Sequence, residues 1–458
     1  MIPNGPSPVP IQGLNVSAFS YSEQQLQQMA AQVLDTARAE GASAADVEVS
    51  ESVGQNVNVR LGEVETIEYN RDKGMGVTVY LGQAKGHAST SDFSTQALVD
   101  TVRAALAIAR YTAADDYAGL PDPALLATTF PDLDLHHGWE LPVDEAIVLA
   151  QRCEDAARAV DTRITNSEGG SVNTHASRWV YANSLGFSGA STGSRYSVSA
   201  AVIAEDEAGM QRDYWYSTRR DPAELESVES VGRRAGERAV RRLGARRVKT
   251  GEYPVLFEAP VAASLLSHWV SAISGSSLYR KSSFLQDSLG QAVFAPCVNV
   301  IEDPFVKKGL ASGAFDAEGV ATQRRELVTA GVQHGYFLSS YSARKLGMAT
   351  TGNAGGPHNL FVTPTATFDA LLQQLGTGLL VTELLGHGIN LVTGDYSRGA
   401  AGFWVENGVI QHPVEEITVA GNLRDMFRQI VGIGDDVLLS SSRQVGSILI
   451  ERMTVAGE

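Results

Sequence analysis

The stretch NVNVRLGEVETIEY, residues 56–69, alternates apolar and polar side chains over most of its length. Successive side chains of a β-strand point to opposite faces, so this period of two residues is typical of a strand that is buried on one face. The same pattern occurs before it, in DVEVS at residues 46–50, and after it, in MGVTVYL at residues 75–81. The sequence therefore predicts three strand-like stretches close together in the N-terminal part.

Helices are predicted on both sides of these strands. Ser22 opens the sequence SEQQ, which has the form of a capping box, and apolar residues with helical spacing follow it. A second run with helical spacing, STQALVDTVRAALAIARYT, covers residues 94–112. We therefore expect an α+β unit at residues 21–112, after a disordered lead-in at residues 1–20 that contains four prolines.

A central region is expected at residues 113–249. It begins with a polar, proline-bearing stretch up to residue 138, which is typical of a linker or a long surface loop. PVDEAIVLAQRCEDAARAVD, residues 142–161, predicts a helix, and short alternating stretches between Ile164 and Ser217 predict an antiparallel meander.

The central region ends in a basic segment, RRAGERAVRRLGARRVK at residues 233–249, with eight basic residues against Glu237. Apolar residues at helical spacing within it indicate an amphipathic helix. We expect its arginines to form a solvated helix face rather than a patch for nucleic acid or a partner.

The remainder, residues 250–458, is predicted to form one β-rich domain. EYPVLFEAP at residues 252–260 indicates a strand, and VAASLLSHWVSAISG at residues 261–275 indicates a helix. After Gly313, glycines are frequent and β-branched segments recur. The predicted fold class is α+β, with an N-terminal mixed α/β region followed by a β-rich C-terminal domain.

Composition excludes several classes of protein. The net charge of −16 opposes a general nucleic-acid surface, which needs basic residues to neutralise phosphates. No apolar run approaches the roughly 20 residues of a membrane span, and the N-terminus lacks the pattern of a signal peptide. With only Cys153 and Cys297, a disulfide framework is not expected, which fits a reducing compartment and a cytoplasmic location.

Two glycine-rich stretches resemble catalytic or binding motifs. GASTG at residues 189–193 matches the G-x-S-x-G nucleophile elbow, but the flanking sequence indicates hairpin strands, so we expect a glycine-rich turn rather than a catalytic Ser191. GNAGGPHN at residues 352–359 lacks the lysine of a P-loop and the spacing of G-x-G-x-x-G. A loop in close approach to another backbone or to a ligand explains its glycines equally well.

A third stretch, TELLGHG at residues 382–388, looks like H-E-x-x-x-H with Thr382 in place of the first histidine. On a helix, the spacing of Glu383 and His387 would let them share a metal ion. The surrounding glycines and the sequence GLLVTELL, residues 378–385, fit a strand equally well. We therefore expect structural roles for both side chains.

Longer blocks of the sequence resemble the PmbA/TldE branch of the TldD/PmbA family, members of which are described as modulators of DNA gyrase and as subunits of a bacterial metalloprotease. The resemblance extends over nearly the whole chain after the lead-in. The blocks that carry it are DKGMGVTVYLGQAKGHASTSDFS, RITNSEGGSVNTH, LYRKSSFLQDSLG, SYSARKLGMATTGNAGGPHN and TGDYSRGAAGFWVENGVIQHPVEEITVAGNLRDMF.

In this family the TldD-type subunit carries H-E-x-x-x-H just after the first strand of its C-terminal domain, and a metal-binding cysteine near its C-terminus. The corresponding segment here, after PVLF, runs from Ser267 to Ala272 and does not contain the motif. Residues 440–458 contain no cysteine. The resemblance thus implies no catalytic residue, metal ligand or cofactor on this chain, and zinc or another divalent metal on the partner subunit.

The resemblance also implies that the chain pairs with a TldD-like metalloprotease subunit and forms part of a cleft for unfolded peptides, with a possible homodimer when the partner is absent. Two alternatives stay open, an independent hydrolase with a metal site at Glu383 and His387, and a regulator of DNA gyrase. Aromatic and arginine side chains are enriched at peptide and subunit interfaces. The candidates for substrate or interface contacts are His268, Tyr279, Arg280, Tyr396, Arg398 and Trp404.

Overall fold

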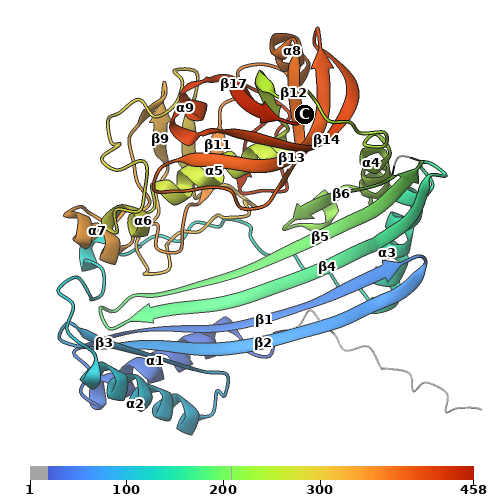
Figure 1. Cartoon of the computed structure of the whole chain (residues 1–458). Coiled ribbons are helices and arrows are strands. Elements are labelled where there is room, and N and C mark those ends of the chain that lie inside the picture. The colour runs from blue at the N-terminus through green and yellow to red at the C-terminus, as the bar shows by residue number, and fades with distance from the viewer. Residues whose placement is uncertain (1–18, 208) are drawn as a thin grey trace, which may run out of the picture.

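The computed structural model describes residues 19–207 and 209–458, so most of the predicted disordered lead-in lies outside the described residues. A long antiparallel sheet occupies the N-terminal half, and a more compact domain lies over one of its faces (Figure 1). The order of the sheet is β3-β2-β1-β4-β5-β6. Its strands are β1 (Ala44–Arg60), β2 (Glu63–Leu81), β3 (Ala84–Thr90), β4 (Ile164–Asn183), β5 (Ser188–Asp206) and β6 (Gly209–Arg219).

The three predicted N-terminal stretches form two long strands instead of three shorter ones. Residues 56–69 span the end of β1 and the start of β2, with the chain reversing at Leu61 and Gly62. Both residues have positive φ, 53° and 82°, which matches a tight hairpin turn of the primed type. The prediction was wrong about the breaks, because strand pairing continues through polar residues whenever both neighbouring strands supply partners.

Four helices cover one face of this sheet: α1 (Glu23–Ala39), α2 (Thr95–Tyr111), α3 (Val143–Arg158) and α4 (Val228–Val240). Alternate residues of β1, such as Val47, Val49, Val57 and Val59, are fully buried against them. The predicted helices and the predicted antiparallel meander of β4, β5 and β6 are confirmed. The residues in between point to the opposite side, which we call the open face, and this side is turned toward the C-terminal domain (Figure 1).

The C-terminal domain is β-rich, as predicted. It begins with the predicted strand and helix, β7 (Gly251–Phe257) and α5 (Ala259–Ala272). A sheet of order β14-β13-β12-β7-β17-β15 curls so that β14 also pairs with β17. The further strands of this sheet are β12 (Gly378–Leu385), β13 (Asp395–Glu406), β14 (Val409–Asn422), β15 (Ile430–Ile433) and β17 (Ile448–Ala456).

A smaller sheet of order β10-β9-β8-β11-β16 and several short helices complete this domain. Their bounds are β8 (Val300–Asp303), β9 (Arg325–Thr329), β10 (Val332–Gln333), β11 (Asn359–Val362), β16 (Arg443–Gln444), α6 (Gly275–Tyr279), α7 (Ser340–Leu346), α8 (Phe368–Leu375) and α9 (Leu423–Arg428). One large hydrophobic core, with the fully buried Trp269 of α5 within it, lies between the two sheets and α5. This core holds α5 in a fixed position beside the open face.

The basic segment at residues 233–249 forms the end of α4 and the turn after it, and six of its eight basic residues are exposed, as predicted. Arg238 and Arg242 are the two exceptions. The side chain of Arg238 is 8% exposed and bridges Asp213 of β6 at 3.1 Å and Glu258, just before α5, at 2.9 Å. Arg242 is 10% exposed and reaches Glu383 of β12 at 2.5 Å. The partners lie in other segments of the chain, so local sequence did not reveal them. These ion pairs join the first sheet to the C-terminal domain.

Between residues 19 and 458, with residue 208 left aside, no helix combines the length and the apolar character that crossing a bilayer requires.

We predict that Arg238→Met destabilises the protein by about 3 kcal/mol, because it leaves two carboxylates buried without their shared cation while it keeps the packing of the side-chain stem. The measurement is the free energy of unfolding from urea denaturation. The matched control is Arg247→Met, whose ion pair with Glu416 is exposed and whose loss should change stability little. Equal stability of the two variants would contradict the assigned role of Arg238.

Candidate functional site

The open face of the sheet carries rows of short, uncharged polar side chains on β1, β4 and β5, while charged residues such as Asp46, Glu48 and Asp72 share this face elsewhere. Residues directly opposite each other in register share a face, so Ser52 of β1, Ser177 of β4 and the neighbouring Gly193 of β5 form one row. A second row consists of Asn58, Ser171 and Ser199, and a third of Asn56, Asn173 and Ser197. Hydroxyls and amides at this density can bond peptide groups without selecting a particular side chain.

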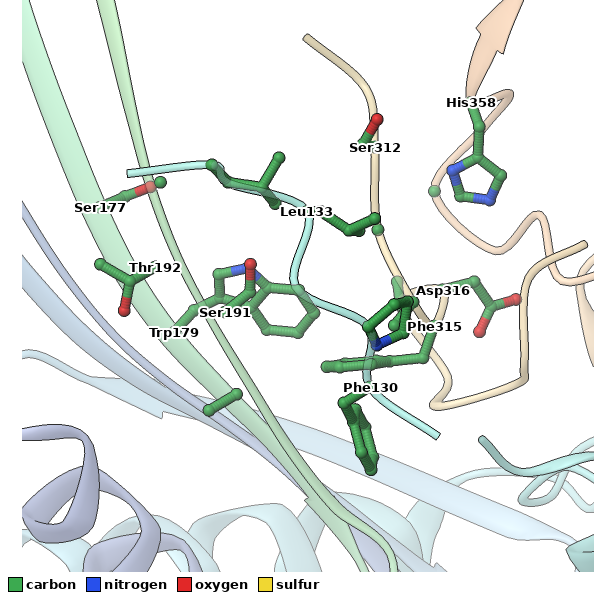
Figure 2. Close-up of a pocket in the computed structure, with 18 of the residues that line it drawn as sticks. Phe130, Leu133, Ser177, Trp179, Ser191, Thr192, Ser312, Phe315, Asp316 and His358 are labelled. Carbon is green, nitrogen blue, oxygen red and sulfur yellow. The ribbon is translucent and has the colours of Figure 1, made fainter. Parts of the chain in front are cut away.

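A central pocket of 460 Å³ lies between the open face and the C-terminal domain. Figure 2 shows Ser177, Trp179, Ser191 and Thr192 on the strands, with Phe130 and Leu133 on the connector between the sheet and the loop of Ser312, Phe315 and Asp316. The predicted linker at residues 113–138 is indeed irregular apart from a short 3-10 turn at Pro123–Leu125. It contributes one wall of the pocket.

Phe315 fixes the C-terminal loop against the sheet. Its ring lies 5.3 Å from the rings of Trp179 and Phe187 and 5.8 Å from that of Phe130, between ring centroids. A Cβ atom on Gly189 would lie 2.6 Å from the Phe315 ring, so glycine is required there by packing. GASTG is therefore part of β5 rather than the predicted turn, which lies just before it, and Ser191 does not sit on a strand-to-helix elbow.

The glycine-rich loop at residues 352–359 forms another wall, and the close-approach interpretation is confirmed. Gly352 has φ +71°, and a Cβ atom there would lie 2.7 Å from the carbonyl oxygen of Ala321. The buried carboxylate of Glu302 accepts hydrogen bonds from the Asn353 amide at 2.7 Å and from the backbone N–H of His358 at 2.8 Å. It also pairs with Arg325 at 2.5 Å, so the loop is held by the protein itself.

Asp316, at the edge of the central pocket, is buried and has an altered acidity. Its carboxylate accepts hydrogen bonds from the backbone N–H groups of Glu318, Val320 and Ala354. Burial nevertheless raises the pKa of Asp316 to about 6, because these donors do not fully replace water. The loop geometry indicates that Asp316 is a positioning residue for the wall of the pocket.

A second pocket of 240 Å³, which we call the edge pocket, lies beside the edge strand β6. Residues from both the first sheet and the C-terminal domain line it. Its lining consists of Arg212, Asp213, Tyr214, Trp215 and Tyr216 of β6, Arg238 of α4, Pro260, Val261 and Ser264 of α5, Thr382, Glu383 and Leu384 of β12, and Arg398 of β13.

Three of the predicted site residues come together near the edge pocket. The rings of His268 and Tyr396 meet edge to face with centroids 6.1 Å apart, and Arg398 follows Tyr396 by two positions on β13. Burial, and secondarily the Arg398 guanidinium, lowers the pKa of His268 to about 4. Burial raises the pKa of Tyr396 to about 12, although Arg398 opposes the shift. His268 Nε2 and the Tyr396 hydroxyl are both buried without a hydrogen-bond partner among the described residues.

The other predicted residues lie elsewhere. Tyr279 and Arg280, at the end of α6, contact each other, and Tyr279 packs on Tyr341 of α7. Trp404 packs edge to face on Tyr253 of β7, and its indole N–H donates to Glu406 at 3.0 Å. No hydrogen bond, ion pair or ring contact within the described residues joins these groups to the His268 cluster.

Glu383 and His387 do not form a helical pair. GLLVTELL is strand β12, as the alternative reading of that stretch predicted, and His387 follows it in an exposed irregular segment. Glu383 is instead the ion-pair partner of Arg242. The spacing argument therefore does not apply, and Glu383 has the structural role that we expected.

The segment that matches the family's metal motif does lie on α5 directly after β7, but its residues do not fit a metal site. Ser267 donates to the Ala263 carbonyl oxygen at 2.9 Å, and Ala272 is buried in the core. His268 remains as one nitrogen donor, without the second histidine and the carboxylate that a catalytic zinc site uses. In residues 19–207 and 209–458, no three histidine, cysteine, aspartate or glutamate side chains are grouped to hold an ion.

Sequence reasoning missed the ion pairs of Asp213, Glu258 and Arg242, which connect to the edge pocket through its lining residues Asp213, Arg238 and Glu383. The usable signal was the i, i+4 spacing of Arg238 and Arg242 beside the small buried residues of α4, which places both guanidinium groups near the covered side of the helix.

Comparisons with known proteins agree with the geometry. Family models of the PmbA/TldA metallopeptidase match residues 45–109 as domain 1, residues 136–243 as the central domain and residues 250–457 as the C-terminal domain. In Haemophilus influenzae, a metalloprotease PmbA homolog is 47% identical over 95% of this chain and 97% of the relative. A metalloprotease TldD homolog from the same organism is 21% identical over 82% of each chain. A crystal structure from Bacteroides thetaiotaomicron, named as a modulator of DNA gyrase, has a TM-score of 0.90 and 28% identity, and the match covers 95% of this chain and all of that one.

We predict that His268 stays neutral well below the ordinary histidine range. Its pKa is lowered in the folded chain, so its contribution to stability is fully present above pH 6.5 and is lost as the pH falls toward 4. The difference in free energy of unfolding between wild type and His268→Gln should therefore change by about 2 kcal/mol across that interval. The direct measurement is an NMR titration of the His268 ring, and a midpoint near 6.5 would contradict the burial argument.

Proposed function

The chain belongs to the PmbA/TldD metallopeptidase family, and we propose that it is the subunit without the catalytic metal in a two-chain peptidase for unfolded peptides. The observation that carries this proposal is the chemistry of α5. The helix lies where the family resemblance puts the H-E-x-x-x-H motif, and it presents Ser267, His268 and Ala272 there. Because His268 is the one metal-ligating side chain at these positions of α5, the helix is not equipped to activate water, which supports a role for this chain in holding substrate.

A TldD-like partner would carry the divalent metal, which we expect to be zinc. The presence of a PmbA homolog and a TldD homolog in one organism supports such a pair of chains. Related chains often assemble through equivalent surfaces, so this chain can also form a homodimer when the partner is absent. Both cysteines are free thiols, which supports a reducing compartment and thus the cytoplasm as the place of assembly.

The open face supports unfolded peptides as the substrate class. An extended chain is commonly held through its main-chain groups, either by a strand edge or by hydrogen bonds to its peptide units. Rows of serine and asparagine on β1, β4 and β5 of the open face offer such bonds, and charged residues join two of these rows only on β2, at Glu68 and Asp72. A folded protein does not present free peptide groups, so this surface favours unfolded segments.

Two alternative functions receive less support. A separate metal site at Glu383 and His387 would have to break the ion pair of Glu383 with Arg242. Direct regulation of DNA gyrase, the name given to the Bacteroides relative, would need a surface for DNA or for gyrase. Arg238 and Arg242 of the basic segment are engaged in internal pairs, and the chain has a net charge of −16.

We predict that this chain alone is inactive and binds no stoichiometric zinc, whereas a mixture with a TldD-like chain forms a stable complex that cleaves unfolded peptides. The reason is that activation of water needs a set of metal ligands, which α5 of this chain lacks and which the TldD-like chain would supply. The measurement combines size-exclusion chromatography, elemental analysis of each peak and a peptide-cleavage assay on each chain and on the mixture.

The control for this experiment is the TldD-like chain in which glutamine replaces the glutamate of H-E-x-x-x-H, the residue that polarises the attacking water, and this variant should still associate but should not cleave. Metal-dependent cleavage by the present chain alone, at the rate of the mixture, would overturn the proposal. Failure of the two chains to associate at micromolar concentration would overturn it as well.

We predict that His387→Ala leaves peptidase activity of the complex within a few-fold of wild type, because His387 lies in an exposed segment after β12 rather than on a helix beside a ligand. The measurement is kcat and KM of the reconstituted complex. A loss on the order of 10³ in kcat, with the fold intact, would identify His387 as a catalytic residue instead.

A further inference from the structure

The edge pocket has one cation that the protein does not neutralise. Arg238, Arg241 and Arg242 are balanced by Asp213, Glu258 and Glu383. Arg212 pairs with Glu168 at 2.7 Å. Arg398 forms no ion pair within the described residues and lines the same 240 Å³ space. An unpaired guanidinium in a partly enclosed pocket attracts an anion, because low local dielectric strengthens the pairing.

The protein holds the Arg398 side chain in one orientation. Its Nη2 donates to the carbonyl oxygen of Leu384 at 3.2 Å, and its Nε lies 3.5 Å from the carbonyl oxygen of Leu385. These two contacts fix the plane of the guanidinium. A guanidinium that is oriented before a ligand arrives loses less side-chain freedom on binding, so it is a better receptor than a mobile one.

A hydroxyl group accompanies this cation. Thr382 is only 5% exposed, lines the edge pocket and has its Oγ1 buried without a hydrogen-bond partner in the described chain. An unbonded buried hydroxyl is costly, and a ligand oxygen would satisfy it. Arg398 and Thr382 together supply N–H and O–H donors, which is the combination that a carboxylate accepts.

The edge of β6 offers main-chain bonding in the same pocket. Along its outer edge, the Tyr214 N–H donates to the Asp213 carboxylate at 2.7 Å, and the Thr218 N–H donates to the Ser440 hydroxyl at 3.0 Å. Strand pairing alternates with a period of two residues, so the peptide groups of Tyr216, between them, also point outward. The peptide groups of Tyr216 lie between the N–H groups of Tyr214 and Thr218, which are already hydrogen-bonded, and Tyr216 lines the edge pocket. Tyr216 can therefore pair with a short length of added strand.

We infer that the edge pocket binds a carboxylate of the substrate peptide, with Arg398 and Thr382 as its receptors and Tyr216 as the main-chain contact. This inference rests on the proposed function, and it assigns to this chain a charge-selective contact beside the serine and asparagine rows of the open face. Pro260, Val261 and Tyr216 would contact the apolar part of the residue that carries the carboxylate. The two sources of such an anion are the C-terminal α-carboxylate and an aspartate or glutamate side chain.

The test measures binding of labelled peptides to the full chain, alone and in the mixture with a TldD-like chain, by fluorescence anisotropy. The probes are an uncharged hexapeptide with a free C-terminus, the same peptide as its C-terminal amide, and the amide with aspartate as the last residue. We expect wild type to bind the free acid about 10-fold or more tightly than the uncharged amide, as a charge-assisted hydrogen bond implies.

Three variants identify the receptor. In Arg398→Met the free acid and the amide should bind equally, and Arg398→Lys should restore part of the difference because it restores the charge. Arg212→Met is the matched control, since Arg212 lines the same pocket but is already paired, and it should keep the full difference. Each variant is checked for an unchanged circular dichroism spectrum and elution volume.

The outcomes separate this inference from the proposed function. Tight binding of the aspartate amide assigns the carboxylate to a side chain, and weak binding assigns it to the peptide terminus; both agree with an Arg398 receptor. Equal binding of the free acid and both amides by wild type, or a preference that survives in Arg398→Met, overturns the inference while the cleft function stands. Absence of binding to all three peptides overturns the proposed substrate-binding role itself.

Discussion

The guanidinium of Arg238 is the contact on which the arrangement of the two halves depends. It comes from a helix that packs on the first sheet, and it meets the carboxylate of Asp213 on that sheet and of Glu258 at the start of the C-terminal domain. Ion pairs of this kind add little net stability, but separating them is costly, because Arg238 would be left charged and buried and each carboxylate would keep only its longer contact, Asp213 with Arg242 and Glu258 with Arg241. The network therefore sets the distance between β6 and α5, and with it the width of the edge pocket.

Local patterns in the sequence were sufficient for most elements and insufficient for the site. Period-two alternation identified the strand character of residues 56–69, and GLLVTELL fitted a strand that the structure confirms as β12. The partner of Glu383 could not be found this way, because Arg242 lies in another domain and only the folded chain brings them together. For the same reason GASTG looked like a turn. Gly189 is required by its packing against the Phe315 ring, which is distant in the sequence, and not by a local turn. His268, Tyr396 and Arg398 were singled out individually, but their grouping depends on how α5 packs on β13.

The helix α5 explains how one family can contain chains with different chemistry on one fold. Its buried side is dictated by the core around Trp269, and this side would be the same whether or not the opposite side binds metal. Here the hydroxyls of Ser267 and Ser271 are satisfied within the helix, because they donate to carbonyl oxygens of the preceding turn, whereas His268 Nε2 has no partner among the described residues. Under the proposed function, serines that bond within their own helix would stand at this segment in place of metal ligands, with the core around Trp269 unchanged.

Retaining the cleft has a consequence for recognition. In the proposed assembly, the rows of serine and asparagine on the open face would bond peptide groups that every substrate has, and they would contribute affinity without choosing among sequences. Selectivity must then come from sites that contact one particular side chain or terminus of the peptide through its charge or shape. In the proposed assembly, the edge pocket is such a site, since it combines one oriented cation with one exposed length of strand edge. The edge pocket lies beside α5, the helix that would correspond to the metal-binding helix of the partner. A peptide anchored there by its carboxylate would have a fixed starting point on the open face, and its other residues would remain unrestricted.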